Sequence, residues 1–382
     1  MLLNYKYEIF LTIEQQEMLN LWLAWCRQTY NSALLDKSNP YKATKKSLSR
    51  QELQKMQVED KKKYAFLKEM PSQPLQEVFF RLEKALEKFF KKEAKYPKIK
   101  SSKDYCSLTF TQFGMAKQYD KKYNKTRTVR RAASLGCKGL LQISGLGLIS
   151  VNWHRKLDGK VKQCIIKRQG TRWYVIFSVE KRNVSNTELD VSKTTGIDVG
   201  IKKFAVLSNG EEIENPKFLR KSEKKLKRQQ RRLSRRKKGS KNWKKQLVKV
   251  QKIHTKVANQ RKDFLHKQSF NLARTYSVIC VEDLKIKNMI KNRHLAKSIA
   301  DAGWGMFRSF LNYKCEKNGG LLVKVKPHFT SQKCSNCGNM VKKSLSVRTH
   351  ICSKCRTILD RDHNAAINIE KEGLKQVTPL AS

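Results

Sequence analysis

The spacing of apolar residues changes along the chain and divides it into segments. Residues 2–11 alternate as in a β-strand, and from there on apolar residues recur at helical spacing. Thr12 and Gln15 are placed to form a capping box at the start of this helix. A second helical run covers residues 75–92. The segment 13–95 is therefore predicted to be a helical domain.

Strand periodicity returns after this helical segment. Residues 107–113, 140–153 and 161–181 alternate between apolar and polar positions, and the last of these segments contains a Gln-Gly turn. Together with the first strand they are predicted to close a small β-barrel domain made of residues 1–12 and 96–185.

Two short apolar strands in the second half carry acidic residues. One is centred on residues 197–199 and contains Asp198, followed by Gly200, which allows a close backbone approach. The other, residues 277–284, ends in acid at Glu282. A charge in a buried strand costs free energy unless it is paired or binds a metal, so both strands indicate a site.

Residues 217–262 contain many basic residues and one acid, Glu223, with a narrow apolar stripe on each side of a Gly-Ser break. This pattern predicts a basic helical hairpin. Charge runs are usually solvated faces, but charge of one sign repels along a bare helix, and phosphate supplies the opposite sign. The candidate phosphate contacts are Lys224, Arg228, Arg231, Arg232 and Arg235. A helix over 300–318 is predicted downstream.

Charge changes the picture of the whole chain. The 382 residues include 83 Lys and Arg against 32 Asp and Glu, a formal net charge of +51. Such an excess predicts a polyanionic partner, with nucleic acid first and a membrane surface as the rival. No run of eighteen apolar residues occurs, and the start of the chain lacks a signal pattern, so a soluble intracellular protein is expected.

The cysteines form two classes. The segment 330–356 holds two Cys-x-x-Cys pairs, a spacing that predicts a structural zinc ribbon with no open metal position; buried or disulfide-linked cysteines are the alternative. The paired cysteines are Cys334, Cys337, Cys352 and Cys355. The others stand singly in mostly apolar settings and are predicted to be reduced core thiols: Cys26, Cys106, Cys137, Cys164, Cys280 and Cys315.

Two aspartates follow the cysteines at the start of a last helix, which is expected to end near Gly373. A lone aspartate there usually caps the helix, but Asp362 joins Asp198 and Glu282 as a third carboxylate from a distant segment. Three carboxylates brought together repel one another, and hard divalent cations relieve this repulsion. A site that holds two Mg²⁺ ions in this way is typical of phosphodiester nucleases, so the three acids predict that activity.

Three motifs together resemble a known family. GIDVG with Asp198, VEDL with Glu282, and the zinc ribbon leading into LDRDHNAAINI closely resemble the split RuvC motifs of TnpB. TnpB is the transposon-encoded, RNA-guided DNA endonuclease often labelled an OrfB-type transposase and related to type V CRISPR effectors. One departure is Arg356, where the second knuckle often carries glycine.

The resemblance implies a multidomain α+β protein. Its parts are a helical recognition domain, a wedge-like β-barrel, an RNase H-like RuvC nuclease domain over 190–329 and 357–382, and an inserted zinc ribbon. Asp198, Glu282 and Asp362 are then the Mg²⁺ ligands, with Mn²⁺ as a substitute, and Asp360 is a neighbour or cap. The implied partners are a guide RNA derived from the transposon end and a double-stranded target DNA, in a prokaryotic cytoplasm at the nucleoid.

The segment at the start of the second helical run resembles the part of the family that reads a short motif beside the target. Gln73 and Gln76 lie there, and glutamine can contact adenine in a major groove. Ordinary helix-start polarity explains these residues equally well.

Other functions compete with the nuclease. They are a catalytically silent RNA-guided repressor, a transposase accessory DNA-binding protein, a transposase acting through a covalent tyrosine, and a guide-free junction resolvase. A repressor is expected to lack a carboxylate, whereas all three positions are acidic, and no His-x-His pair supports the tyrosine transposase.

Overall fold

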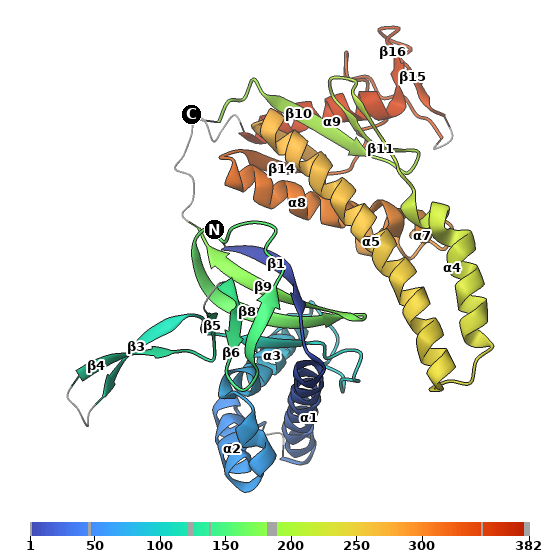
Figure 1. Cartoon of the computed structure of the whole chain (residues 1–382). Coiled ribbons are helices and arrows are strands. Elements are labelled where there is room, and N and C mark those ends of the chain that lie inside the picture. The colour runs from blue at the N-terminus through green and yellow to red at the C-terminus, as the bar shows by residue number, and fades with distance from the viewer. Residues whose placement is uncertain are drawn as a thin grey trace. The chain divides into compact units, whose positions relative to one another are not determined.

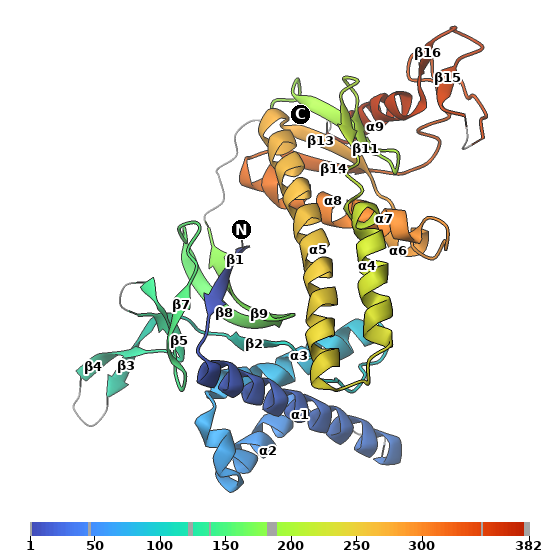
Figure 2. The same cartoon turned by 45° about the vertical axis from the view of Figure 1, so that its right-hand side comes forward.

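The computed structural model describes residues 2–44, 47–120, 125–136, 139–181, 189–344 and 347–377. The chain divides into two compact units, Met1–Arg182 and Asn183–Ser382 (Figures 1 and 2). Cys137 lies outside the described residues.

The first unit contains a seven-stranded sheet in the order β2-β8-β9-β1-β7-β6-β5. The first strand pairs antiparallel with β9 on one side and with β7 on the other. The order has β2 at one end and β5 at the other, and closure into a barrel stays a prediction. The strands are β1 (Leu2–Phe10), β2 (Ser107–Phe110), β5 (Ala133–Leu135), β6 (Leu141–Ile143), β7 (Gly147–Val151), β8 (Lys160–Gln169) and β9 (Arg172–Glu180), with β3 (Met115–Asp120) and β4 (Lys125–Arg130) as a separate hairpin.

The helices of this unit are α1 (Ile13–Thr44), α2 (Arg50–Lys63), η1 (Ala65–Glu69) and α3 (Ser72–Phe90). The predicted capping box of α1 is confirmed, because the Gln15 N–H donates to Thr12 Oγ1 at 3.2 Å and the Thr12 N–H donates to Gln15 Oε1 at 3.1 Å. Buried residues of helices and strands belong to one hydrophobic cluster, which includes Trp22 and Leu75 from helices and Phe177 from β9. The helical and strand segments expected as two domains thus share a core.

The second unit is built on a five-stranded sheet in the order β12-β11-β10-β13-β14. Strands β10, β13 and β14 are parallel, and β11 and β12 are antiparallel. The strands are β10 (Thr194–Val199), β11 (Lys203–Leu207), β12 (Glu212–Glu214), β13 (Val278–Glu282) and β14 (Leu321–Val325). The segment Ser208-Asn209-Gly210, whose composition is typical of a hairpin turn, joins β11 to β12.

Helices cover both faces of this sheet. Along β13, Ile279 and Val281 pack in the cluster formed with α5 (Lys241–Thr275), α7 (Ala296–Ala302) and α8 (Trp304–Lys317). Val278 and Cys280 point to the other face and pack against α9 (Arg361–Val377). Successive side chains of a strand alternate between faces, so the uninterrupted apolar run of β13 serves two cores.

The basic hairpin predicted over 217–262 consists of α4 (Phe218–Ser234) and α5, which lie side by side and antiparallel in Figures 1 and 2. A buried amide pair joins them, since Gln246 Nε2 donates to Gln229 Oε1 at 2.8 Å. The second arm runs on to Thr275, beyond the predicted end, because its last turns pack into the core of the second unit through Leu265 and Leu272.

Two predicted helix boundaries are wrong. The helix expected over 300–318 is two helices, because Gly303 adopts a left-handed conformation with φ 72° between α7 and α8. The last helix does not end near Gly373 but passes through it to Val377. A Cβ atom at Gly373 would lie 2.1 Å from Cys280 Sγ, so this glycine serves close packing of α9 on β13. The remaining short elements are α6 (Ile286–Met289), β15 (Thr349–Ile351) and β16 (Ile358–Asp360).

A second glycine brings α9 onto β10. A Cβ atom at Gly196 would lie 2.1 Å from the Ala366 carbonyl oxygen and 2.5 Å from the Glu370 nitrogen. Both obstacles are backbone atoms, so no side-chain rotation relieves the overlap. The helix therefore depends on Gly196 for its distance from the sheet.

We expect Gly196→Ala to destabilise the second unit by about 3 kcal/mol, because α9 must move off the sheet. The measurement is the urea dependence of unfolding. Gly305→Ala is the matched control: it lies in α8, its added Cβ would meet the flexible Ile286 Cδ1 at 3.3 Å, and its cost should stay within about 1 kcal/mol. Equal effects of the two variants would contradict the close-packing role of Gly196.

No helix in the described ranges is both long enough and apolar enough to cross a membrane.

Candidate active site and cysteine cluster

Two of the predicted carboxylates lie at one edge of the second sheet. The parallel strands β10 and β13 pair with Ile197 opposite Val281, so the next residues, Asp198 and Glu282, reach the same end of the sheet. The carboxyl ends of parallel strands are where sites form in sheets covered by helices on both faces. Asp362 approaches this edge from the first turn of α9, the helix packed on β10.

The pKa of Asp198 reflects its burial and its nearness to the other two acids. Burial raises the pKa of the Asp198 carboxyl well above its usual range, and the negative charges of Glu282 and Asp362 raise it further. The other two predicted acids therefore both act on Asp198, although the carboxylate oxygens of the three do not all lie within 4.8 Å of one another in the described part of the chain.

Glu282 is held by a residue that sequence reasoning missed. The Thr330 hydroxyl donates to Glu282 Oε1 at 2.6 Å. Burial raises the pKa of the Glu282 carboxyl, and the hydrogen bond from Thr330 acts in the opposite direction. Thr330 is the residue with which the ribbon segment begins, so the ribbon contacts this carboxylate directly.

Asp362 is paired with two guanidinium groups. Arg348 Nη1 lies 3.2 Å from Asp362 Oδ2, and Arg361 Nη2 lies 3.2 Å from Asp362 Oδ1. The Asp362 side chain is only 16% exposed and Arg361 17%, whereas the Arg348 side chain is 45% exposed, so the contact with Arg361 is the more shielded of the two. Arg348 lies between the two cysteine pairs. It was not predicted as a site residue, because the chain has 83 basic residues and no sequence feature sets this one apart.

The neighbouring Asp360 has a different position. It is exposed, and its Oδ1 accepts hydrogen bonds from the backbone N–H groups of Asp362 at 2.8 Å and His363 at 3.3 Å. This is the geometry of a helix cap. The prediction that Asp360 is a neighbour or cap is confirmed. The negative charges of Asp362 and, less strongly, Asp360 both act on Asp198, and the role of Asp362 as the third metal ligand stays a prediction.

The first turns of α9 are fastened to the first cysteine pair. Asn364 is fully buried; its Oδ1 accepts from the Ser335 N–H at 2.9 Å and its Nδ2 donates to the Lys333 carbonyl at 2.9 Å. Asn368 Nδ2 donates to the carbonyls of Lys333 at 2.7 Å and Thr330 at 2.8 Å. Both asparagines lie in the motif LDRDHNAAINI, and their role as side-chain links to the cysteine segment is visible only in the structure.

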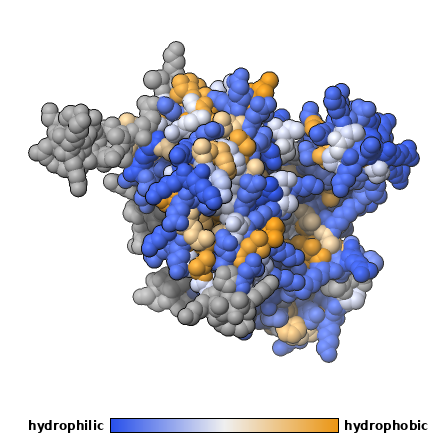
Figure 3. Space-filling view, turned by 90° about the horizontal axis from the view of Figure 1, so that it is seen from below, coloured by the Kyte–Doolittle hydropathy of each residue, from blue (hydrophilic) through white to orange (hydrophobic). Residues whose placement is uncertain are grey.

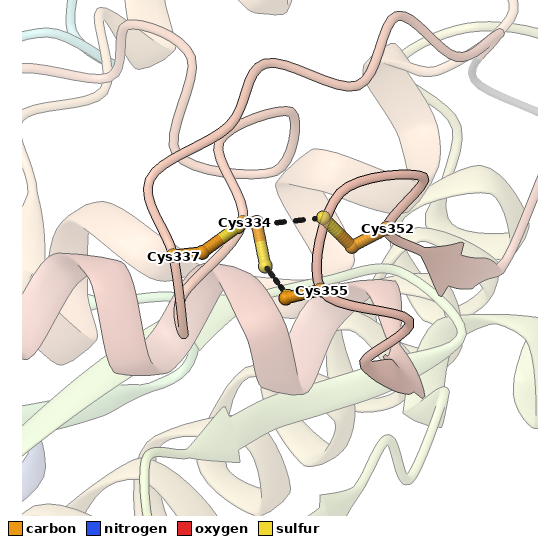
Figure 4. Close-up of side chains that lie close together, drawn as sticks. All are labelled: Cys334, Cys337, Cys352 and Cys355. Atoms are coloured by element: carbon orange, nitrogen blue, oxygen red, sulfur yellow. Dashed lines mark hydrogen bonds between the residues drawn. The ribbon is translucent and has the colours of Figure 1, made fainter.

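The four paired cysteines come together as predicted (Figure 4). Cys334 Sγ lies 3.6 Å from Cys355 Sγ, and Cys337 Sγ lies 3.5 Å from Cys352 Sγ. Thiolates 2.3 Å from one tetrahedral ion stand about 3.8 Å apart. Disulfide sulfurs are about 2.05 Å apart, so the disulfide alternative is wrong for these pairs. The cluster is compatible with a zinc site.

The departure at Arg356 is visible in the backbone. Arg356 has φ 55°, and Gly338, which follows the first pair in the same position, has φ 76°. Glycine favours this left-handed conformation, and Arg356 adopts it against its own preference. The sulfur cluster nevertheless forms around this turn.

Of the single cysteines, all that the structure describes are free thiols. Four are buried, and burial raises the pKa of Cys26, Cys280 and Cys315 to about 12. The prediction of reduced core thiols is confirmed for these; Cys106 is half-buried.

The residues predicted to contact nucleic acid differ in solvent exposure. The five basic residues of α4 and its C-terminal end are exposed. Gln76 is exposed, whereas Gln73 is half-buried and its Oε1 accepts from the Gln112 N–H at 3.3 Å. The contacts of all seven with nucleic acid stay predictions.

Comparison with known proteins decides the family. A putative RNA-guided DNA endonuclease of Streptomyces pristinaespiralis is 34% identical over 97% of this chain and 89% of its own length. The putative RNA-guided DNA endonuclease InsQ of Escherichia coli K12 is 30% identical over 97% of this chain and 92% of its own length. The chain belongs to the OrfB (TnpB) family. The predicted resemblance is thereby confirmed.

Family models match three parts of this OrfB protein. They are described as a probable transposase over residues 176–293, a Cas12f1-like TNB domain over 304–369 and a helix-turn-helix domain over 1–46. The described residues of the last match form β1 followed by the single helix α1. Among solved structures, a Cas12f1–sgRNA–target DNA complex has a TM-score of 0.56 at 16% identity, over 94% of this chain and 83% of that one, which shows a shared fold.

Proposed function

We propose that this OrfB protein is an RNA-guided DNA endonuclease of a transposable element, which cleaves target DNA beside a short adjacent motif. The observation that supports the proposal most is that Asp198 and Glu282 end two paired parallel strands, and that the negative charges of Glu282 and Asp362 both act on the buried Asp198. Two relatives that cover nearly the whole chain are named putative RNA-guided DNA endonucleases, and a protein of similar fold was solved with an sgRNA and target DNA.

The residues at the sheet edge fit divalent cations. They offer carboxylate oxygens, the donors preferred by Mg²⁺ and Mn²⁺, and their mutual repulsion at Asp198 is relieved by positive charge. Bound Mg²⁺ ions supply charge stabilisation for a phosphodiester and lower the pKa of water. Asp198, Glu282 and Asp362 hold these ions in the proposal.

The surrounding residues position the three carboxylates. Thr330 fixes Glu282 by its hydroxyl, and Asp360 orients the first turn of α9. Arg348 and Arg361 partly balance the charge of Asp362. Rigid support of this kind holds reactive groups in one geometry before substrate arrives.

The domain assignment follows from the same proposal. Residues 190–329 and 357–382 form an RNase H-like RuvC nuclease domain, and 330–356 form a ribbon that holds Zn²⁺ with four thiolates. Residues 13–95 act as the recognition domain, and residues 1–12 with 96–185 as the wedge-like barrel. The guide RNA originates from the transposon end, and the protein acts at the prokaryotic nucleoid.

The basic arm α4 is proposed to contact phosphates of guide or target. Neutralising Arg228, Arg231 and Arg232 to Gln should weaken binding of RNA or DNA and flatten the slope of log affinity against log salt by about 0.7 to 0.9 per lost contact. Lys227→Gln is the control, because Lys227 pairs with Glu223 at 3.1 Å and should change the slope less. An unchanged slope in the triple variant would show that these arginines are solvated surface residues that do not contact phosphate.

The experiment that tests the function starts from the purified protein. RNA that co-purifies is sequenced, and a duplex matched to its variable end is offered with Mg²⁺. Cleavage beside a fixed short motif is expected, and mutation of the motif should stop it. Guide-dependent binding without cleavage would favour the silent repressor, and cleavage that persists after removal of the RNA would favour the guide-free resolvase.

A further inference from the structure

A cavity of about 200 Å³ lies in the first unit between α1, α2, η1 and α3. Four aromatic side chains line it: Phe79, which is buried, and Trp25, Tyr64 and Phe66, whose rings lie near one another. The ring centroids of Trp25 and Phe66 lie 5.2 Å apart, and those of Tyr64 and Phe66 lie 5.8 Å apart. Tyr64 and Phe66 are each 42% exposed, so both side chains can be reached from solvent. Hydrophobic side chains also reach the surface between hydrophilic ones in the view from below (Figure 3).

Polar groups line the same cavity. Gln57 is only 7% exposed, and its Nε2 has no hydrogen-bond partner among the described residues. Leaving a buried amide N–H unpaired is unfavourable, which a ligand with an acceptor atom relieves. Asp36 and Asp60 add carboxylates to the lining, although the chain has 83 basic and only 32 acidic residues.

These groups define the chemistry of a ligand. The aromatic rings can stack on a flat ring of the ligand. The amide N–H of Gln57 needs a hydrogen-bond acceptor on the ligand, and the carboxylates of Asp36 and Asp60 accept from hydrogen-bond donors on it. The same carboxylates repel phosphate from the interior of the cavity. Every nucleobase has a flat face and acceptor atoms, but the exocyclic amino group of adenine, guanine or cytosine supplies two N–H donors where uracil and thymine have a single ring N–H. Two carboxylates in the lining therefore favour an amino-bearing base. A purely apolar side chain leaves the amide of Gln57 unpaired.

The rim is suited to the rest of a nucleotide. Lys62 and Lys63 are exposed in the last turn of α2, and Lys63 Nζ lies 5.5 Å from the centre of the Tyr64 ring. Aromatic faces beside lysines are the usual arrangement for binding single strands, with the base stacked and the phosphates outside.

We propose that this cavity binds one unpaired, amino-bearing nucleobase of a single-stranded nucleic acid. The choice of nucleic acid as ligand rests on the proposed function. The site is separate from the carboxylates, so it concerns the holding of a strand and not its cleavage.

The test uses the full chain and short single strands that carry one 2-aminopurine, an amino-bearing base whose fluorescence falls when it stacks. Saturable quenching is expected, and RNA and DNA versions show which strand binds more tightly. Phe66→Ala should weaken binding about tenfold, because one stacking surface is lost. The salt slope should stay the same, because no phosphate contact is removed. Phe90→Ala is the matched control: Phe90 is an exposed aromatic of the same unit outside the cavity.

Gln57→Leu separates ligand binding from folding. If the amide serves the ligand, this variant should be at least as stable as the wild type, because an unpaired buried group is removed, and yet bind the probe more weakly. Wild-type affinity in both Phe66→Ala and Gln57→Leu would overturn the proposal. Stronger displacement of the probe by N-acetyltryptophanamide than by AMP or GMP would overturn it in favour of a peptide side chain. Base binding without guided cleavage would refute the proposed function alone, and guided cleavage without base binding would refute this inference alone.

Discussion

Asp198→Ala should abolish cleavage of a guide-matched duplex, with a loss of about 10³-fold or more, while binding of guide and target survives. The charges of both Glu282 and Asp362 act on Asp198. Removal of the Asp198 carboxylate therefore takes the central oxygen donor from the proposed Mg²⁺ site. The basic residues that are proposed to hold nucleic acid lie elsewhere, and the loss of one acid makes a positive chain slightly more positive. Cleavage and gel-shift assays on one matched target, with equal RNA loading, measure both effects.

The pair Asp360 and Asp362 provides the internal control for this prediction. Asp362→Ala should behave like Asp198→Ala, as should Glu282→Ala. Asp360→Ala should lose only its capping bonds, at a cost of about 1 kcal/mol in stability, and keep clear activity. An inactive Asp360→Ala beside an active Asp362→Ala would show that the wrong aspartate has been assigned. EDTA should stop cleavage, and Mn²⁺ should restore it.

Cys334→Ser should release the metal of the ribbon and unfold it. One of four thiolates is lost, and metal binding contributes folding free energy on the order of 10 kcal/mol in small zinc modules. The damage should reach the carboxylates, because Asn364 and Asn368 fasten the start of α9 to Lys333, next to this cysteine. We therefore expect cleavage to fall together with zinc content.

Metal analysis and limited proteolysis of the ribbon measure this result. Cys106→Ser is the matched control, since Cys106 is a half-buried single thiol outside the cluster and should retain the full zinc content. Purified wild-type protein without zinc would contradict the assignment. Full cleavage by a zinc-free Cys334→Ser protein would contradict the coupling through α9.

Much of the site was predictable because its signals are local. The spacing of two cysteine pairs restricts them to one metal geometry, and an acid in an apolar strand is conspicuous because burial of a charge is unfavourable. The uninterrupted apolar run of β13 predicts a buried strand without reference to the rest of the chain. These features depend on residues within a few positions of one another.

Helix ends were less predictable, and glycine shows why. Gly303 ends α7 by a left-handed turn, whereas Gly373 lies within α9 because Cys280 leaves no room for a side chain. The same residue type thus ends one helix and continues another. The difference depends on a strand about ninety positions away in the chain.

The sequence by itself determined the family resemblance, the four cysteines of the cluster and the choice of three candidate acids, because each stands in a short motif or is a charge within an apolar strand. Only the tertiary structure decided that Thr330 holds Glu282, that Arg348 pairs with Asp362, and that Asp360 is a cap. It also placed the unpaired amide of Gln57 at an aromatic cavity. Such contacts join segments that are distant in the chain. Their partners depend on how the sheet and its helices pack, and the spacing of neighbouring residues contains no information about that packing.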